Sequence, residues 1–165
     1  MKRLLELDAK DYTPDMPVTV RYCVRGVILR NGRLAVQQST AGDCKILGGG
    51  MEPGEDPAEA LSREVEEESG LLVRKDTLQP LGQIHEKRRD LYEADKVYEC
   101  YTDYYICQVQ VETGLPHMTA SEIEKGYHLT WVTPEEFINY NDAFAFQPWI
   151  HRDVLFVMKN VTGLI

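Results

Sequence analysis

The chain has 165 residues, of which 43% are hydrophobic and 27% are charged, as expected for one globular domain spanning residues 1–165. Lys and Arg number 18 against 27 Asp and Glu, which gives a formal net charge of -9. This acidity argues against a nucleic-acid polymer or an anionic membrane surface as the main partner, because both bind clustered basic charge.

Nothing in the sequence predicts export or membrane insertion. Leu4 and Leu5 are followed at once by Glu6, so no signal-peptide core is present, and the longest apolar run, Val154–Met158, is far too short for a bilayer. The four cysteines show neither CxxC pairs nor zinc-ligand spacing. We therefore expect a cytoplasmic protein without disulfides or structural zinc.

The first half of the chain predicts strands, then a glycine-rich loop, then a helix. Alternating apolar residues over Val18–Ser39, with Asn31-Gly32 as a turn, predict a β-hairpin. Ala41–Glu55 contains five glycines and one proline and predicts a loop. A helix is expected from about Pro57 to Ser69.

The second half continues the alternation of strands and helices. Strands are expected over Leu81–His85, Val97–Val111 and His128–Val132, the second of them long and bent or split in two. Thr133-Pro134-Glu135-Glu136 is typical of a helix start, and Trp149–Asn160 predicts a closing helix. Together these elements predict an α/β fold with a mixed β-sheet.

The helix after the glycine loop carries its own start and stop signals. Asp56 is placed to cap the N-terminus, Pro57 occupies the first helical position, and Glu59 is the expected capping-box partner. Gly70 supplies the left-handed residue that ends the helix.

The same helix is expected to have an acidic face. At the helical pitch Ala58, Leu61 and Val65 form the buried stripe, while Glu66 points away from it. Like charges at this spacing repel, and a hard divalent cation such as Mg²⁺ would offset that repulsion. A plain solvated acidic face is the alternative. The acidic residues that share one face are Glu64, Glu67 and Glu68.

The whole segment resembles the Nudix box without a mismatch: Gly49, five residues, Glu55, seven residues, then Arg63-Glu64-Val65-Glu66-Glu67-Glu68-Ser69-Gly70-Leu71. The resemblance implies an α/β/α sandwich and hydrolysis of a diphosphate linkage in a nucleotide-like substrate. In that family the glutamates matching Glu64, Glu67 and Glu68 bind Mg²⁺ or Mn²⁺, often with the main-chain carbonyl near Gly49. The arginine matching Arg63 orients a box glutamate, Glu55 helps to hold the loop, and the catalytic base varies.

Several residues outside the box are weaker candidates for substrate binding. Arg88 and Arg89, with Lys87, are expected in a loop that clamps a phosphate or sugar, and Tyr92 belongs to a tyrosine-rich region that offers stacking surfaces. Each of these also has an ordinary structural explanation. Further candidates are Glu122 or Glu124 in a loop, as an extra ligand or base, and Arg21 and Arg25 on one strand face, as phosphate contacts.

The sequence therefore predicts a Mg²⁺- or Mn²⁺-dependent hydrolase of the Nudix type. Nucleoside triphosphates and nucleoside diphosphate sugars or ADP-ribose are the competing substrate classes. The alternative is a non-catalytic Nudix-like module that senses a nucleotide, and a homodimer remains open.

Overall fold

The computed structural model describes residues 1–164, and its largest sheet is mixed. The strand order is β1-β7-β8-β2, with parallel pairs at the two edges and an antiparallel pair between β7 and β8. The β2–β8 pairing runs without a shift from Val18 opposite Val97 to Val27 opposite Ile106. Its strands are β1 (Arg3–Asp8), β2 (Val18–Val27), β7 (Gln79–Arg89) and β8 (Val97–Ile106).

A second sheet has the order β10-β4-β3, with β5 also paired to β4, and a small third sheet pairs β6 with β9. The bounds are β3 (Leu29–Arg30), β4 (Arg33–Gln38), β5 (Cys44–Ile46), β6 (Leu71–Val73), β9 (Val109–Thr113) and β10 (His128–Val132).

The predicted hairpin over Val18–Ser39 is too long. The turn itself is as predicted, because Asn31 and Gly32 have φ values of 50° and 73°, which a type I′ turn requires. Only β3 and β4 pair across it, however, whereas β2 leaves this hairpin and pairs with β8. Alternating hydrophobicity identifies strands but not their partners, so the sequence pattern could not separate these two arrangements.

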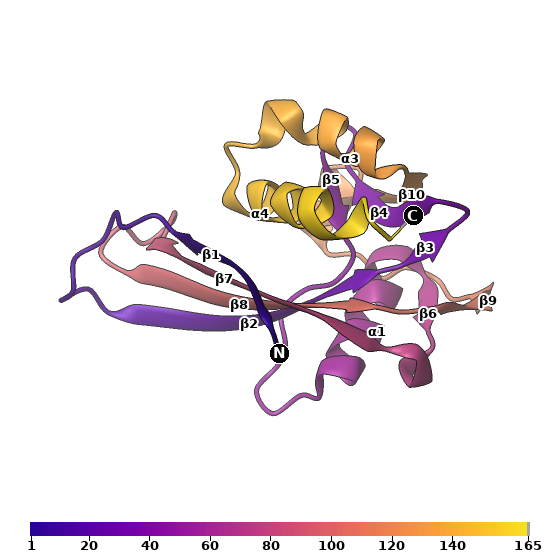
Figure 1. The fold of residues 1–165 in the computed structure, drawn as a ribbon, viewed down its shortest axis with the longest axis horizontal. Helices are drawn as coiled ribbons and strands as arrows, with labels where there is room; N and C mark the ends of the chain where they lie inside the picture. Colours follow the sequence, from indigo (N-terminus) through magenta and orange to yellow (C-terminus); the bar gives the residue numbers. More distant parts are fainter. Residues whose placement is uncertain (165) are drawn as a thin grey trace.

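Helices lie on both sides of the strands. The four α-helices are α1 (Pro57–Ser69), α2 (Ala120–Glu124), α3 (Pro134–Asn141) and α4 (Pro148–Phe156), and the turns are η1 (Lys75–Thr77), η2 (Asp142–Phe144) and the π-helical η3 (Val157–Val161) that continues α4. Figure 1 shows α3 and α4 on one side of the strands and α1 on the other. No helix within residues 1–164 has the length and apolar composition needed to span a bilayer.

Two apolar clusters hold these layers together. One joins the strands to the C-terminal helices through Tyr104, Phe137 and Phe156. The other joins them to α1 through Leu61 and Val65. The layers and the mixed sheet confirm the predicted α/β/α sandwich.

Helix α1 has the predicted bounds, but the predictions made for Glu59 and Ala58 are wrong. Asp56 accepts a hydrogen bond from the amide of Ala58, and Gly70 ends the helix at φ 73°. Glu59 does not close a capping box; its carboxylate instead pairs with Lys75 of η1. The buried stripe is formed by Ala60, not Ala58, together with Leu61 and Val65.

Candidate active site

The glycine run after β5 lies directly against β2. The amide of Val24 donates to the carbonyl of Gly49 at 2.9 Å, and the amide of Met51 donates to the carbonyl of Tyr22 at 2.9 Å. Gly48 has φ +126°, and a Cβ at this position would lie 2.2 Å from the carbonyl oxygen of Val24. Only glycine can therefore hold the loop this close to the strand.

Glu68 connects α1 to this loop through a hydrogen bond. Its side chain is buried at 7% exposure, and its Oε2 accepts a hydrogen bond from the amide of Gly48 at 2.8 Å. Burial raises the pKa of Glu68 to about 7, although Arg25, Lys45 and the Gly48 amide favour the charged form. The protein thus places a carboxylate where water cannot fully solvate it.

Glu64 and Glu67 converge on one cationic nitrogen. Nη1 of Arg63 lies 2.7 Å from Oε1 of Glu64 and 3.5 Å from Oε2 of Glu67. Glu64 also lies against Gly49, because a Cβ at Gly49 would be 2.1 Å from its Oε2. The side chain of Glu67 is 43% exposed and faces solvent.

Arg63 holds the loop and the helix together. Its Nε and Nη2 bind the two oxygens of Glu55 at 2.9 and 3.0 Å, and Nη2 also donates to the carbonyl of Gly50 at 3.1 Å. These hydrogen bonds to Arg63 lower the pKa of Glu55. One guanidinium therefore links Glu55, Glu64 and the carbonyl of Gly50.

The donors fit a hard divalent cation. The carboxylates of Glu64 and Glu68 lie against the loop, and those of Glu64 and Glu67 share a positive charge at Arg63 Nη1. Within residues 1–164 no three His, Cys, Asp or Glu side chains form a ready metal cluster. Carboxylate oxygens are the ligands that Mg²⁺ and Mn²⁺ prefer. The carbonyl of Gly49 keeps one lone pair free of its bond to Val24.

Two basic residues, Arg25 and Lys45, also lie at the glycine loop. Nη1 of Arg25 donates to the carbonyls of Ile46, at 2.8 Å, and of Gly48. Nζ of Lys45 lies 3.7 Å from Oε1 of Glu122 on α2. Gly48 thus contacts an acidic residue through its amide and a basic residue through its carbonyl.

Sequence reasoning missed Lys45. It is the one charged residue in β5, between Cys44 and Ile46 and three residues before Gly48. This short distance from the glycine run could have identified Lys45 as a site residue. Glu122 and Glu124 lie in helix α2 and not in the predicted loop. Glu122 contacts Lys45 and caps α2, whereas Glu124 is exposed.

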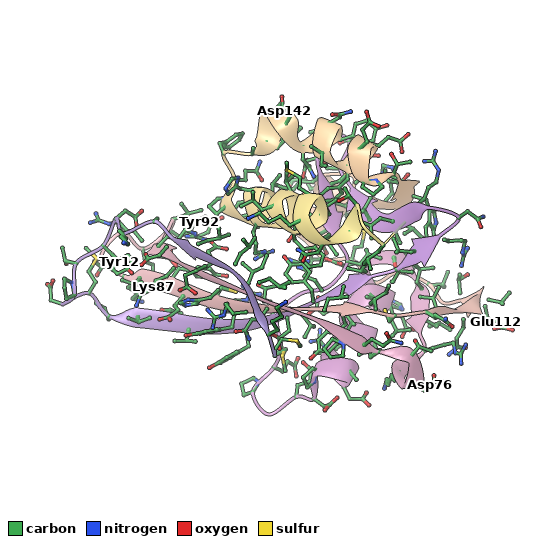
Figure 2. All side chains as sticks on the ribbon, in the orientation of Figure 1. Tyr12, Asp76, Lys87, Tyr92, Glu112 and Asp142 are labelled. Atoms are coloured by element: carbon green, nitrogen blue, oxygen red, sulfur yellow. The ribbon has the colours of Figure 1, made fainter. Side chains whose placement is uncertain are left out.

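The Lys87-Arg88-Arg89 segment is part of β7, so the predicted loop is wrong here as well. Its side chains alternate between the two faces of the strand, which splits the expected basic cluster. Arg88 pairs with Glu86 at 2.7 Å, and Arg89 binds Asp11. Tyr92 is 88% exposed in the turn after β7, and Figure 2 shows it at the end of the sheet remote from α1.

Replacing Arg63 with lysine is expected to lower kcat by about 10- to 100-fold, because a single ammonium cannot bind Glu55 in a bidentate manner and also reach Glu64. The measurement is steady-state hydrolysis, with the melting temperature as a check on folding. A variant with unchanged kcat would show that Arg63 does not position Glu64.

Replacing Gly49 with alanine is expected to preserve the fold but to lower activity by about 100-fold. The new methyl group would displace only the end of the Glu64 side chain, since no backbone atom is among the three nearest neighbours of the added Cβ. Hydrolysis rates and melting temperature should therefore separate. Equal activity in variant and parent would contradict the placement of Glu64.

The chain thus combines an α/β/α fold with a glycine loop and a following helix that bears Glu64, Glu67 and Glu68. A family model for the NUDIX domain matches residues 21–154, and the chain belongs to this family. None of the curated protein sequences compared with it is a match.

Solved structures of the same fold are distant in sequence. A MutT NUDIX hydrolase from Burkholderia pseudomallei has 19% identity and a TM-score of 0.55, covering 71% of this chain and 85% of its own. A NUDIX hydrolase from Nitrosomonas europaea has 22% identity and a TM-score of 0.56, covering 82% and 86%. A UDP-X diphosphatase has 18% identity and a TM-score of 0.51, covering 71% and 52%. At these identities the likeness is one of fold.

Proposed function

We propose that this protein hydrolyses the diphosphate linkage of a nucleotide-like substrate with the help of Mg²⁺ or Mn²⁺. The observation that carries the proposal is that Glu64 and Glu67 both contact Nη1 of Arg63, while the neighbouring Glu68 accepts the amide of Gly48 in the glycine loop. A helix that served only as a solvated acidic face would not bury Glu68 or pin Glu64 against Gly49.

Each residue of the site has a defined task in this proposal. Glu64, Glu67 and Glu68 would hold the metal, and Arg63 with Glu55 would keep the loop and Glu64 in place. A bound divalent ion neutralises phosphate oxygens and lowers the pKa of a coordinated water. A carboxylate of this group, or Glu122 across the loop, accepts the proton of the attacking water.

Two substrate classes agree with this arrangement. Nucleoside triphosphates would give a monophosphate and pyrophosphate, whereas nucleoside diphosphate sugars or ADP-ribose would be cleaved between their two phosphates. The solved structures of the same fold include a protein named as a MutT hydrolase and one named as a UDP-X diphosphatase. We infer that the substrate belongs to one of these two classes.

The test is a substrate panel incubated with Mg²⁺ and scored for phosphate, pyrophosphate and nucleoside monophosphate. The proposal expects monophosphate from at least one substrate, and loss of that product when a chelator removes the metal. Saturable nucleotide binding without turnover would contradict hydrolysis and would identify a sensing module instead.

A further inference from the structure

A small pocket lies between β5, α2 and the start of α4, where Arg25 and Lys45 lie at the glycine loop. Its volume is 290 Å³, near the lower end for ligand pockets, so it suits a phosphate or a sugar acid better than a second nucleoside. Three of its lining residues are cationic and one is acidic, although the whole chain is acidic. The lining residues that matter here are Arg25, Lys45, Glu122, Lys125, Gln147 and Trp149.

The two inner cations have bonding capacity to spare. Nε of Arg25 is buried and has no hydrogen-bond partner within residues 1–164, although Nη1 is bound to the loop. Lys45 has an 18% exposed side chain, and its Nζ lies over the ring of Tyr127, 4.2 Å from the centroid. Burial lowers the pKa of Lys45, which marks an ammonium poorly solvated by water.

Glu122 does not fully neutralise these cations. Its Oε2 accepts hydrogen bonds from the amide and hydroxyl of Thr119, at 2.9 and 2.8 Å, and so closes the capping box of α2. Its other oxygen stays 3.7 Å from Nζ of Lys45, which is longer than a hydrogen bond. Glu68 and Asp153 also act on Arg25 and Lys45, but within residues 1–164 no hydrogen bond occupies Nζ of Lys45, which keeps its donors for a ligand.

The pocket and the carboxylates share the glycine loop. Gly48 donates its amide to Glu68 and accepts Arg25 at its carbonyl, so one residue of the loop contacts both sites. A substrate whose diphosphate lies at α1 can extend past the loop toward Lys45. Gln147 and Trp149 then offer an amide and an indole face to the body of the entering group.

We propose that this pocket binds an anionic group of the substrate outside the scissile linkage, such as a further phosphate or a sugar carboxylate. The inference rests on the proposed function, because it takes the diphosphate to lie at the carboxylates of α1. It narrows the substrate class to compounds with at least one negative group besides the linkage that is cleaved.

The test compares UDP-glucuronate with UDP-glucose, which differ by one carboxylate. The parent should favour UDP-glucuronate in kcat/KM, and Lys45→Met should reduce that preference by about 10-fold or more, since one charged hydrogen bond is lost. Lys125→Met, at an exposed residue, should act in the same direction with a smaller effect. Lys96→Met, in the turn before β8, is the control and should leave the preference unchanged. Equal losses for both substrates in Lys45→Met would overturn the proposal.

A binding measurement keeps the result independent of turnover. Inorganic tripolyphosphate is titrated calorimetrically into metal-free protein in the presence of a chelator. We expect binding that weakens with added KCl and falls about 10-fold in Lys45→Met but not in Lys96→Met. If neither sugar nucleotide is hydrolysed, the proposed function has failed on these substrates, and tripolyphosphate binding alone decides. Tripolyphosphate binding that is absent, or equal in Lys45→Met and parent, would overturn the proposal that this pocket binds an anion.

Discussion

Replacing Glu68 with glutamine is expected to abolish hydrolysis, by about 1,000-fold or more, and to stabilise the metal-free protein above pH 7. Burial raises the pKa of Glu68 from 4.5 to about 7, so the folded state holds a proton that the unfolded state releases. The associated stability is complete below pH 4.5 and is lost as the pH rises through about 7. Glutamine removes this loss and can still accept the Gly48 amide, which gives a gain of about 2–3 kcal/mol in unfolding free energy.

Glu67→Gln is the matched comparison, because the side chain of Glu67 is 43% exposed. It should reduce hydrolysis strongly but change the unfolding free energy of metal-free protein by less than about 0.5 kcal/mol. Denaturant unfolding in a chelator, above and below pH 7, measures both variants. Destabilisation by Glu68→Gln above pH 7 would contradict the conclusion that burial raises the pKa of Glu68.

Replacing Gly48 with alanine is expected to cost more than about 4 kcal/mol of stability and to eliminate activity. The added Cβ would lie 2.2 Å from the carbonyl oxygen of Val24 and 3.0 Å from Cα of Arg25, both backbone atoms that cannot swing aside. The φ of +126° adds strain of its own. Low soluble yield or a large drop in melting temperature is the expected result.

Gly42→Ala separates these two causes. Gly42 has φ +108°, similar to Gly48, but an added Cβ would meet nothing within 4 Å. We expect this control to lose only about 1 kcal/mol, from the backbone conformation alone. Equal losses in Gly42→Ala and Gly48→Ala would mean that the contact with β2 is unimportant.

Helix α1 was predictable because its signals are local. Asp56, Pro57 and Gly70 lie within one turn of its ends and mark them without help from the rest of the chain. The same holds for the side chains on its acidic face, since helical pitch alone places Glu64, Glu67 and Glu68 together. What pitch cannot supply is their individual state: Glu68 is buried because the glycine loop covers it, and Glu67 is not.

The parts that could not be predicted depend on contacts between distant segments. β2 pairs with β8 some 80 residues later, and Val18 to Val97 is the first pair of that ladder. β7 extends through Arg89 because β8 pairs with it that far and β1 pairs with it as far as Lys87, so charged residues there remain in a strand. Lys45 reaches the site only because β5 pairs with β4 and α2 packs beside it.

The net charge of -9 therefore does not describe the surroundings of Gly48, where charges of both signs meet. Glu68 accepts the amide of Gly48, and Arg25 donates to its carbonyl. An acidic total does not prevent a phosphate from binding, because nearby cations can still attract it. The local arrangement of charges, and not the net charge of the chain, decides which anion can bind.

The most direct measurement is a Mg²⁺ titration of diphosphate hydrolysis in parent, Glu67→Gln and Glu66→Gln. Glu66 is the neighbouring carboxylate, which lies near Gly114 and away from the loop. We predict saturable Mg²⁺ dependence in the parent, a loss of about 1,000-fold in Glu67→Gln, and parent-like turnover in Glu66→Gln. Turnover that needs no divalent metal, or an equal loss in both variants, would contradict a metal site on the Glu64, Glu67 and Glu68 face of α1.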